Sequence, residues 1–173
     1  MKVNFLHELI DYLHGDKPYS VRNYIMEQTA KIKDNNKGHF WELVLEKAMS
    51  SHTTLLESNA WYRDFADGSD AKFATFYKRT DGVYEASVSN IRKKIGPLRV
   101  CLCVPGETYH RLFFLFIPHH AYQGYAEGSD ALKFTLKANT GNISGNLTKY
   151  LCSFDEVCRP YDEKEVKSMH ILG

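Results

Sequence analysis

Three carboxylates and a lysine lie close together in the stretch Asp64-Phe-Ala-Asp67-Gly-Ser-Asp70-Ala-Lys72. Asp70 and Lys72 are two residues apart on an expected strand, so both side chains leave the same face. A carboxylate can hold a divalent cation through hard oxygen ligands. A neighbouring lysine can orient an attacking water or steady the charge that develops on a phosphate. With a second carboxylate, this chemistry would suit phosphodiester hydrolysis, although Asp-Gly-Ser-Asp is also good turn and capping sequence.

The elements that must position these residues change in type near residue 50. Apolar residues at three- and four-residue spacing predict helices up to that point, and Glu42 lies on the polar side of the third one. Alternating and continuous apolar runs predict strands after it. The expected helices are 3–13, 20–34 and 37–50, with a short one near 162–169, and the expected strands are 53–56, 72–78, 83–88, 98–104 and 111–117.

This order of elements predicts an α+β fold, with N-terminal helices followed by a mixed, largely antiparallel β-sheet. The length and the 43% apolar composition suit one domain over residues 1–173. It divides into a helical region at 1–50, a sheet region at 53–137, and a loop and C-terminal tail at 138–173. The dipeptide Asp81-Gly82 predicts a hairpin, and a two-residue turn there would pair Lys78 with Glu85.

An acid-x-Lys element on a strand, with an acid shortly before it and a glutamate on the preceding helix, resembles the PD-(D/E)XK nuclease superfamily. The resemblance covers roughly residues 37–104 and implies a restriction-endonuclease-like enzyme that depends on Mg²⁺ or Mn²⁺. It gives Asp70 and Lys72 the acid-x-Lys role, makes Asp64 the upstream metal-binding acid, and makes Glu42 the helix acid that assists the metal. The chain departs from the family in having no Pro-Asp pair and a short stretch at 88–98 where the family places a helix.

A second mapping makes Asp70 the first acid and Glu85-Ala-Ser87 the second element, with serine in place of the lysine. A two-residue turn would put Asp70 eight residues along the strand from the partner of Glu85, roughly 26 Å away. We therefore rank Glu85 below Asp64. His119 is a further lower-ranked candidate for a ligand or an acid/base. It is followed by His120, and adjacent histidines on an extended segment point to opposite faces, so they rarely bind one metal together.

A basic run follows the acidic stretch and would bind phosphate backbones. We predict that it contacts nucleic acid through Arg92, Lys93, Lys94 and Arg99. The net charge of the whole chain is only +1, so any such interaction depends on this local patch. The longest apolar run, residues 112–117, is far too short to cross a membrane. With four cysteines and no secretory pattern, we expect a cytoplasmic protein with free thiols.

These features favour a metal-dependent endonuclease that hydrolyses DNA phosphodiester bonds, of the restriction or mobile-element type. Such an enzyme would be expected to form a homodimer in order to cut two strands. The alternative is a non-catalytic nucleic-acid-binding or effector-binding module that uses the same basic run, with the acidic stretch serving as a turn. A third reading is a protein-interaction domain that presents aromatic surface. Metal dependence separates the first reading from the other two.

Overall fold

The computed structural model describes residues 18–57, 63–106, 110–137 and 141–161. Four α-helices lie in this part of the chain: α2 (Pro18–Lys31), α3 (Asp34–Ala48), α4 (His119–Ser129) and α5 (Phe154–Val157). The strands are β1 (Asp70–Thr75), β2 (Tyr77–Lys78), β3 (Tyr84–Ser89), β4 (Leu98–Val104), β5 (Arg111–Ile117), β6 (Ala131–Leu136), β7 (Ile143–Ser144) and β8 (Leu151–Cys152), with a 3₁₀ turn at Thr148–Tyr150.

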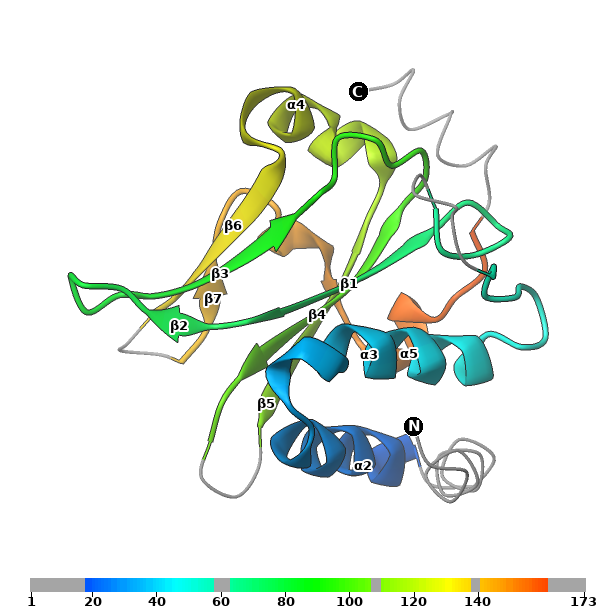
Figure 1. The fold of residues 1–173 in the computed structure, drawn as a ribbon, viewed down its shortest axis with the longest axis horizontal. Helices are drawn as coiled ribbons and strands as arrows, with labels where there is room; N and C mark the ends of the chain where they lie inside the picture. The colour runs from blue at the N-terminus through cyan, green and yellow to red at the C-terminus, as the bar shows by residue number, and fades with distance from the viewer. Residues whose placement is uncertain (1–17, 58–62, 107–109, 138–140, 162–173) are drawn as a thin grey trace.

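The strands form two four-stranded sheets, in the orders β1-β4-β5-β8 and β2-β3-β6-β7. Only β1 and β4 pair in parallel among the described strands, with Asp70 opposite Leu98. The chain passes from one sheet to the other at Phe76, whose N–H donates to the Cys103 carbonyl. Figure 1 shows α2 and α3 on one side of the sheets and α4 at the opposite end. The predicted single α+β domain with a largely antiparallel, mixed sheet arrangement is therefore confirmed.

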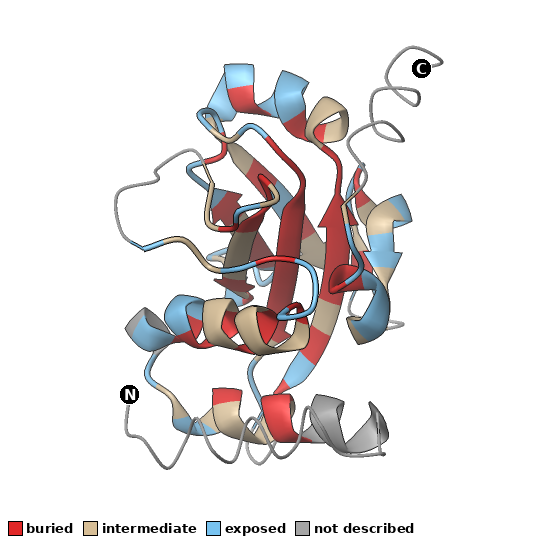
Figure 2. Ribbon diagram, turned by 90° about the vertical axis from the view of Figure 1, so that its right-hand side faces the viewer, coloured by how far each residue is buried: buried red, intermediate tan, exposed pale blue. Residues whose placement is uncertain are grey.

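Strand β4 lies at the centre and divides the core into two apolar clusters. Its alternate residues Cys101 and Cys103 face a cluster under α2 and α3, while Val100 and Leu102 face a cluster between the sheets and α4. Figure 2 shows these strands buried between the helices. A continuous apolar run is the expected sequence of a strand covered on both faces. The first cluster is closed by Trp41, which stacks on Phe114 with 5.6 Å between ring centroids.

The strands at 98–104 and 111–117 are confirmed residue for residue, but other boundaries differ. Helix α4 lies inside the region expected to be sheet, and β7, β8 and α5 lie in the region expected to be loop and tail. The expected strand at 53–56 is reduced to one bridge between Leu55 and Phe65. The helices predicted at 3–13 and 162–169 lie outside the described residues.

The hairpin differs from the prediction by one residue. Arg79 N–H donates to the Val83 carbonyl, which leaves a three-residue loop, and Glu85 pairs with Tyr77 rather than with Lys78. Gly82 adopts a φ of +87°, and a glycine in this conformation closes a three-residue hairpin loop without steric cost. Asp81 adds support by accepting a hydrogen bond from the Val83 N–H.

Candidate functional site

Asp70, the first residue of β1, is buried with two ammonium groups against its carboxylate. The side chain is 2% exposed. Nζ of Lys94 lies 3.0 Å from Oδ1, and Nζ of Lys72 lies 3.7 Å from Oδ2. Burial of charged groups is costly unless they are paired, so this arrangement needs both lysines. The sequence predicts Lys94 as a member of the nucleic-acid-binding run and does not predict this ion pair.

Lys72 reaches Asp70 because the two residues are two positions apart on one strand, as the sequence predicted. Its ammonium also donates to the Asn90 carbonyl at 3.2 Å, which ties β1 to the segment after β3. The side chain is 15% exposed, so its charged end lies near the surface.

Asp64 is brought beside Asp70 by a turn that folds the chain back on itself. Its N–H donates to the Ser69 carbonyl at 3.1 Å, and its Oδ2 accepts from the Ala71 N–H at 2.8 Å. Asp67 closes the same turn, because its Oδ1 accepts from both the N–H and the hydroxyl of Ser69. The turn interpretation of this stretch is therefore right for Asp67, and the same turn positions Asp64 and Asp70.

Glu42 approaches the same place from α3, which packs on β1. Partial burial raises its pKa, and the negative charge of Asp64 raises it further. The helix acid and the upstream acid are thus close enough to interact electrostatically. We call Glu42, Asp64, Asp70, Lys72 and Lys94 the Asp70 cluster.

Removal from water governs the protonation of this cluster. Burial raises the pKa of Asp70 to about 7, with a further contribution from Asp64, although Lys72 and Lys94 act in the opposite direction. Burial likewise lowers the pKa of Lys72. Both shifts favour the neutral forms, as expected where solvent is excluded. A carboxyl that titrates near pH 7 can accept a proton at physiological pH, and such groups are concentrated at functional sites.

The basic run does not form one continuous phosphate-binding patch. Arg99 was expected to contact DNA, but its side chain is fully buried. Its guanidinium donates to Asp67, to Ser69 and to the carbonyls of Val157 and Arg159. The prediction for Arg99 is wrong because the residue lies on the central strand β4, where a charged side chain needs internal partners.

Arg92 and Lys93 do lie at the surface, so the two remaining members of the run can meet a partner. Arg92 is partly held in place, since its Nε donates to the Ala126 carbonyl of α4 at 3.2 Å. Lys94 belongs to the Asp70 cluster instead. The run predicted as one patch thus divides into a surface pair, a site residue and a core residue.

The two lower-ranked candidates belong to other surroundings. Glu85 lies in the second sheet, where its carboxylate pairs with Arg79 at 2.8 Å and accepts from the Tyr77 hydroxyl at 3.1 Å. His119 begins α4 and packs edge-on against Tyr122, with 5.2 Å between ring centroids. The segment after Pro118 is helical, so the expectation of an extended segment with histidines on opposite faces is wrong.

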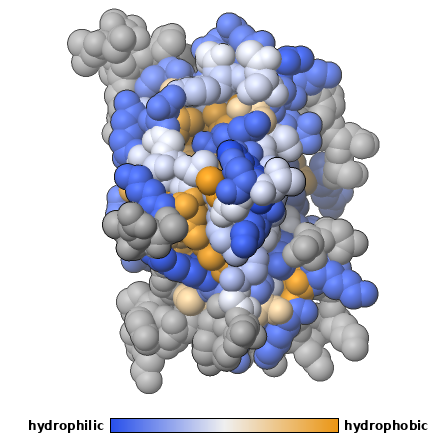
Figure 3. All heavy atoms as spheres, turned by 90° about the vertical axis from the view of Figure 1, so that its left-hand side faces the viewer, coloured by the Kyte–Doolittle hydropathy of each residue, from blue (hydrophilic) through white to orange (hydrophobic). Residues whose placement is uncertain are grey.

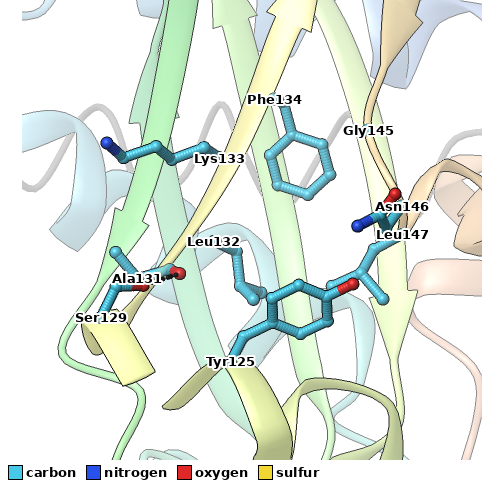
Figure 4. A pocket seen from close by; sticks show the side chains of 9 residues that line it. All are labelled: Tyr125, Ser129, Ala131, Leu132, Lys133, Phe134, Gly145, Asn146 and Leu147. Carbon is cyan, nitrogen blue, oxygen red and sulfur yellow. Dashed lines mark hydrogen bonds between the residues drawn. The ribbon is translucent and has the colours of Figure 1, made fainter. Parts of the chain in front are cut away.

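A separate apolar pocket of about 310 Å³ lies between α4, β6 and the segment after β7. Figure 4 shows the Tyr125 ring between Leu132 and Leu147, with Asn146 at one edge. The face of the molecule in Figure 3 is hollowed, with apolar side chains visible among hydrophilic ones. None of the residues that line this pocket belongs to the Asp70 cluster, so the two sites are distinct.

Within the described ranges, no three His, Cys, Asp or Glu side chains converge as metal ligands. The helices of that part include none that is long and apolar enough to cross a membrane.

Comparison of the chain with family models, curated proteins and solved structures finds no match. Function must therefore be inferred from the residues of the site itself.

Proposed function

We propose that the chain is a metal-dependent endonuclease that hydrolyses DNA phosphodiester bonds, of the restriction or mobile-element type, with the Asp70 cluster as its active site. The observation that carries the proposal is the buried Asp70 carboxylate, which meets two lysines while Asp64 and Glu42 lie close by. The Asp64 and Asp70 carboxylates and two ammonium groups lie together at the start of β1, and burying such charges is costly to the fold. Such costly clusters of ionisable groups are typical of active sites.

The donor set suits Mg²⁺ or Mn²⁺, because carboxylate oxygens are the hard ligands that these cations prefer. Asp64 and Asp70 would hold the cation and Glu42 would assist. Mg²⁺ is commonly held by one or two carboxylates together with water and substrate phosphate, so three converging side chains are not required. Once bound, the cation would make a water more acidic and neutralise charge on the phosphate.

The chain's own residues then have separable roles. Lys72, held by the Asn90 carbonyl, would orient the attacking water and steady charge on the phosphate. Arg92 and Lys93, both exposed, would contact neighbouring phosphates of the DNA backbone and set the orientation of the duplex.

The proposal extends to assembly and compartment. Cutting both strands of a duplex calls for two sites, which a two-fold homodimer would supply. We place the enzyme in the cytoplasm, since the cysteines at 101, 103, 152 and 158 are all free thiols, as is usual in a reducing environment.

Cleavage tests this proposal directly. The purified protein is incubated with supercoiled plasmid and with mixed genomic DNA in Mg²⁺, in Mn²⁺ or in EDTA. We expect cutting that requires metal and falls at least about 100-fold in Lys72→Ala, as expected for loss of a catalytic charge. Lys78→Ala removes an exposed lysine of β2 and serves as the matched control.

Equal cutting by Lys72→Ala, or cutting that persists in EDTA, would overturn the assignment. If no variant cuts but the protein binds DNA with an affinity that falls steeply as salt rises, the exposed Arg92 and Lys93 support a non-catalytic nucleic-acid-binding module instead.

A further inference from the structure

Lys94 lies closer to Asp70 than Lys72 does, although it comes from a loop twenty-four residues further along the chain. Its Nζ is 3.0 Å from Oδ1, against 3.7 Å between Lys72 Nζ and Oδ2, and its side chain is 11% exposed. The charge of Lys94 also opposes the rise in the pKa of Glu42 that burial and Asp64 cause, so it acts on a second carboxylate of the cluster. An ammonium therefore lies at one of the oxygens that the proposed function assigns to a cation.

The loop that carries Lys94 is anchored at its first residues. Oδ1 of Asp130 accepts from the N–H groups of Ile91 and Arg92, at 2.9 and 2.5 Å. Asn90, just before them, adopts a φ of +58°, which turns the chain out of β3. The Lys94 N–H donates to the Ile91 carbonyl at 3.2 Å and closes a turn.

The same loop is anchored again where it ends. The Tyr122 hydroxyl donates to the Gly96 carbonyl at 2.6 Å. A Cβ at Gly96 would lie 2.2 Å from the Gly68 carbonyl oxygen, so the loop packs directly on the turn that precedes Asp70. With both ends held, the backbone places the Lys94 side chain at Asp70 rather than leaving it to find a partner in solvent.

The two lysines differ in what holds them. Lys72 extends from a strand and also donates to the Asn90 carbonyl, which would keep its ammonium in place if Asp70 were bound by another cation. Lys94 makes the shorter ion pair with Asp70, and a divalent cation at Oδ1 would compete with it for the same oxygen.

We propose that Lys94 is a built-in counter-ion of Asp70 that competes with the divalent cation for Oδ1, and that it thereby sets the cation concentration at which the site fills. The inference rests on the metal site of the proposed function, but it makes a claim about binding that does not depend on cleavage. Removing the Lys94 ammonium frees Oδ1 for the cation, while Lys72 stays beside Oδ2, and we expect binding to tighten.

The experiment measures Mn²⁺ binding to the full chain by isothermal titration calorimetry. Lys94→Met removes the charge and keeps the length of the side chain, and we expect Mn²⁺ to bind at least about tenfold more tightly, comparable to the net worth of one charged hydrogen bond. Lys94→Arg retains the charge and should bind about as the wild type does. Lys78→Met, at an exposed lysine of β2 outside the proposed site, is the matched control, and thermal unfolding checks that each variant is folded.

Equal Mn²⁺ affinity in wild type, Lys94→Met and Lys94→Arg overturns the inference, and so does the absence of binding in every variant. If Lys94→Met does not fold, Lys94→Gln is measured in its place. Tighter binding without any DNA cutting would support the counter-ion role and refute the endonuclease. Metal-dependent cutting by the wild type with unchanged affinity in Lys94→Met would do the reverse.

Discussion

Two groups of paired acidic and basic side chains in this molecule have pKa values that are shifted in opposite directions. In the Asp70 cluster, burial raises the pKa of Asp70 and lowers that of Lys72, despite the ion pair between them. In the β2–β3 hairpin, hydrogen bonds from Arg79 lower the pKa of Asp81 and of Glu85, and the same bonds raise that of Arg79. The neutral forms are therefore favoured in the Asp70 cluster, whereas the charged forms are favoured in the hairpin group.

The difference lies in what covers each carboxylate. Glu85 is only 8% exposed, but it pairs with Arg79 and accepts from the Tyr77 hydroxyl on a hairpin that projects from the body of the molecule (Figure 1). Asp70 is covered by the body of the protein and meets its lysines at 3.0 and 3.7 Å. Burial by the core removes water without supplying equivalent hydrogen bonds, so the charged form is disfavoured. Ion pairing alone therefore does not distinguish a candidate site, whereas carboxyls whose charged form is disfavoured by burial are found more often at functional sites.

The largest expected effect separates the two groups by activity. Asp70→Asn keeps the shape of the side chain and removes the charge that the proposed function assigns to the cation, so we expect the initial rate of plasmid cutting to fall about a thousandfold. Glu85→Gln alters the hairpin group in the same way and should leave the rate within about twofold. A similar loss in both variants would contradict the distinction.

The second prediction concerns the pH dependence of stability, because folding raises the pKa of Asp70 and lowers that of Glu85. The folded-state pKa of Asp70 is raised from 3.8 to about 7, so the folded protein binds the extra proton and loses stability as pH rises through that window. Asp70→Asn does not titrate there. Its free energy of unfolding relative to wild type should increase by on the order of 4 kcal/mol from below pH 4 to above pH 7, measured by urea unfolding.

Glu85→Gln should behave in the opposite sense in the same titration. The pKa of Glu85 is lowered on folding, so the wild type gains stability as pH rises through the acidic range. The variant should therefore become less stable relative to wild type over that range. Parallel slopes for Asp70→Asn and Glu85→Gln would remove the contrast between the two groups.

A third prediction concerns a buried charge that has several hydrogen-bond partners. Arg99 is fully buried like Asp70, yet its guanidinium makes four hydrogen bonds and lies over the Phe116 ring. Arg99→Met leaves Asp67 and two carbonyls without these donors and should lower the free energy of unfolding by about 3 kcal/mol. Arg92→Met at the surface is the control, expected within about 0.5 kcal/mol of wild type.

The smallest change in stability is expected in the hairpin group, for a substitution of Arg79. Arg79→Gln breaks the pairs with Asp81 and Glu85, but solvent and salt already screen these charges. We expect a change in melting temperature smaller than that of Arg99→Met and one that vanishes in about 1 M NaCl. A loss that persists at high salt would show that the hairpin pairs act as a buried network.

Local pattern was sufficient for the strands that are continuous apolar runs and for residues two positions apart on one strand. The continuous apolar runs at 98–104 and 111–117 became β4 and β5 with unchanged bounds. The i, i+2 spacing of Asp70 and Lys72 put their charged ends within an ion-pair distance. Helix α4 was missed because His119–Ser129 contains two glycines and begins after Pro118, without a side-chain N-cap.

The division of the basic run shows where sequence reasoning stops. Arg92, Lys93, Lys94 and Arg99 are close in sequence and alike in charge, and together they read as one phosphate-binding patch. In the folded chain, Arg99 lies in the core and Lys94 lies against Asp70, whereas Arg92 and Lys93 remain exposed. Which side of a strand or loop meets the core depends on partners that are distant in sequence.

Residue types and short spacings thus specified the α+β class and the central strands, and they supplied the acids and the lysine of the proposed site. Folding added Lys94 to that group and excluded Arg99 and Glu85. The anchors of the Lys94 loop explain this, since Asp130 and Tyr122 lie more than twenty residues away along the chain. Burial and the pKa of a carboxyl depend on everything that surrounds it, and for Asp70 most of that is brought together only when the sheets and helices pack.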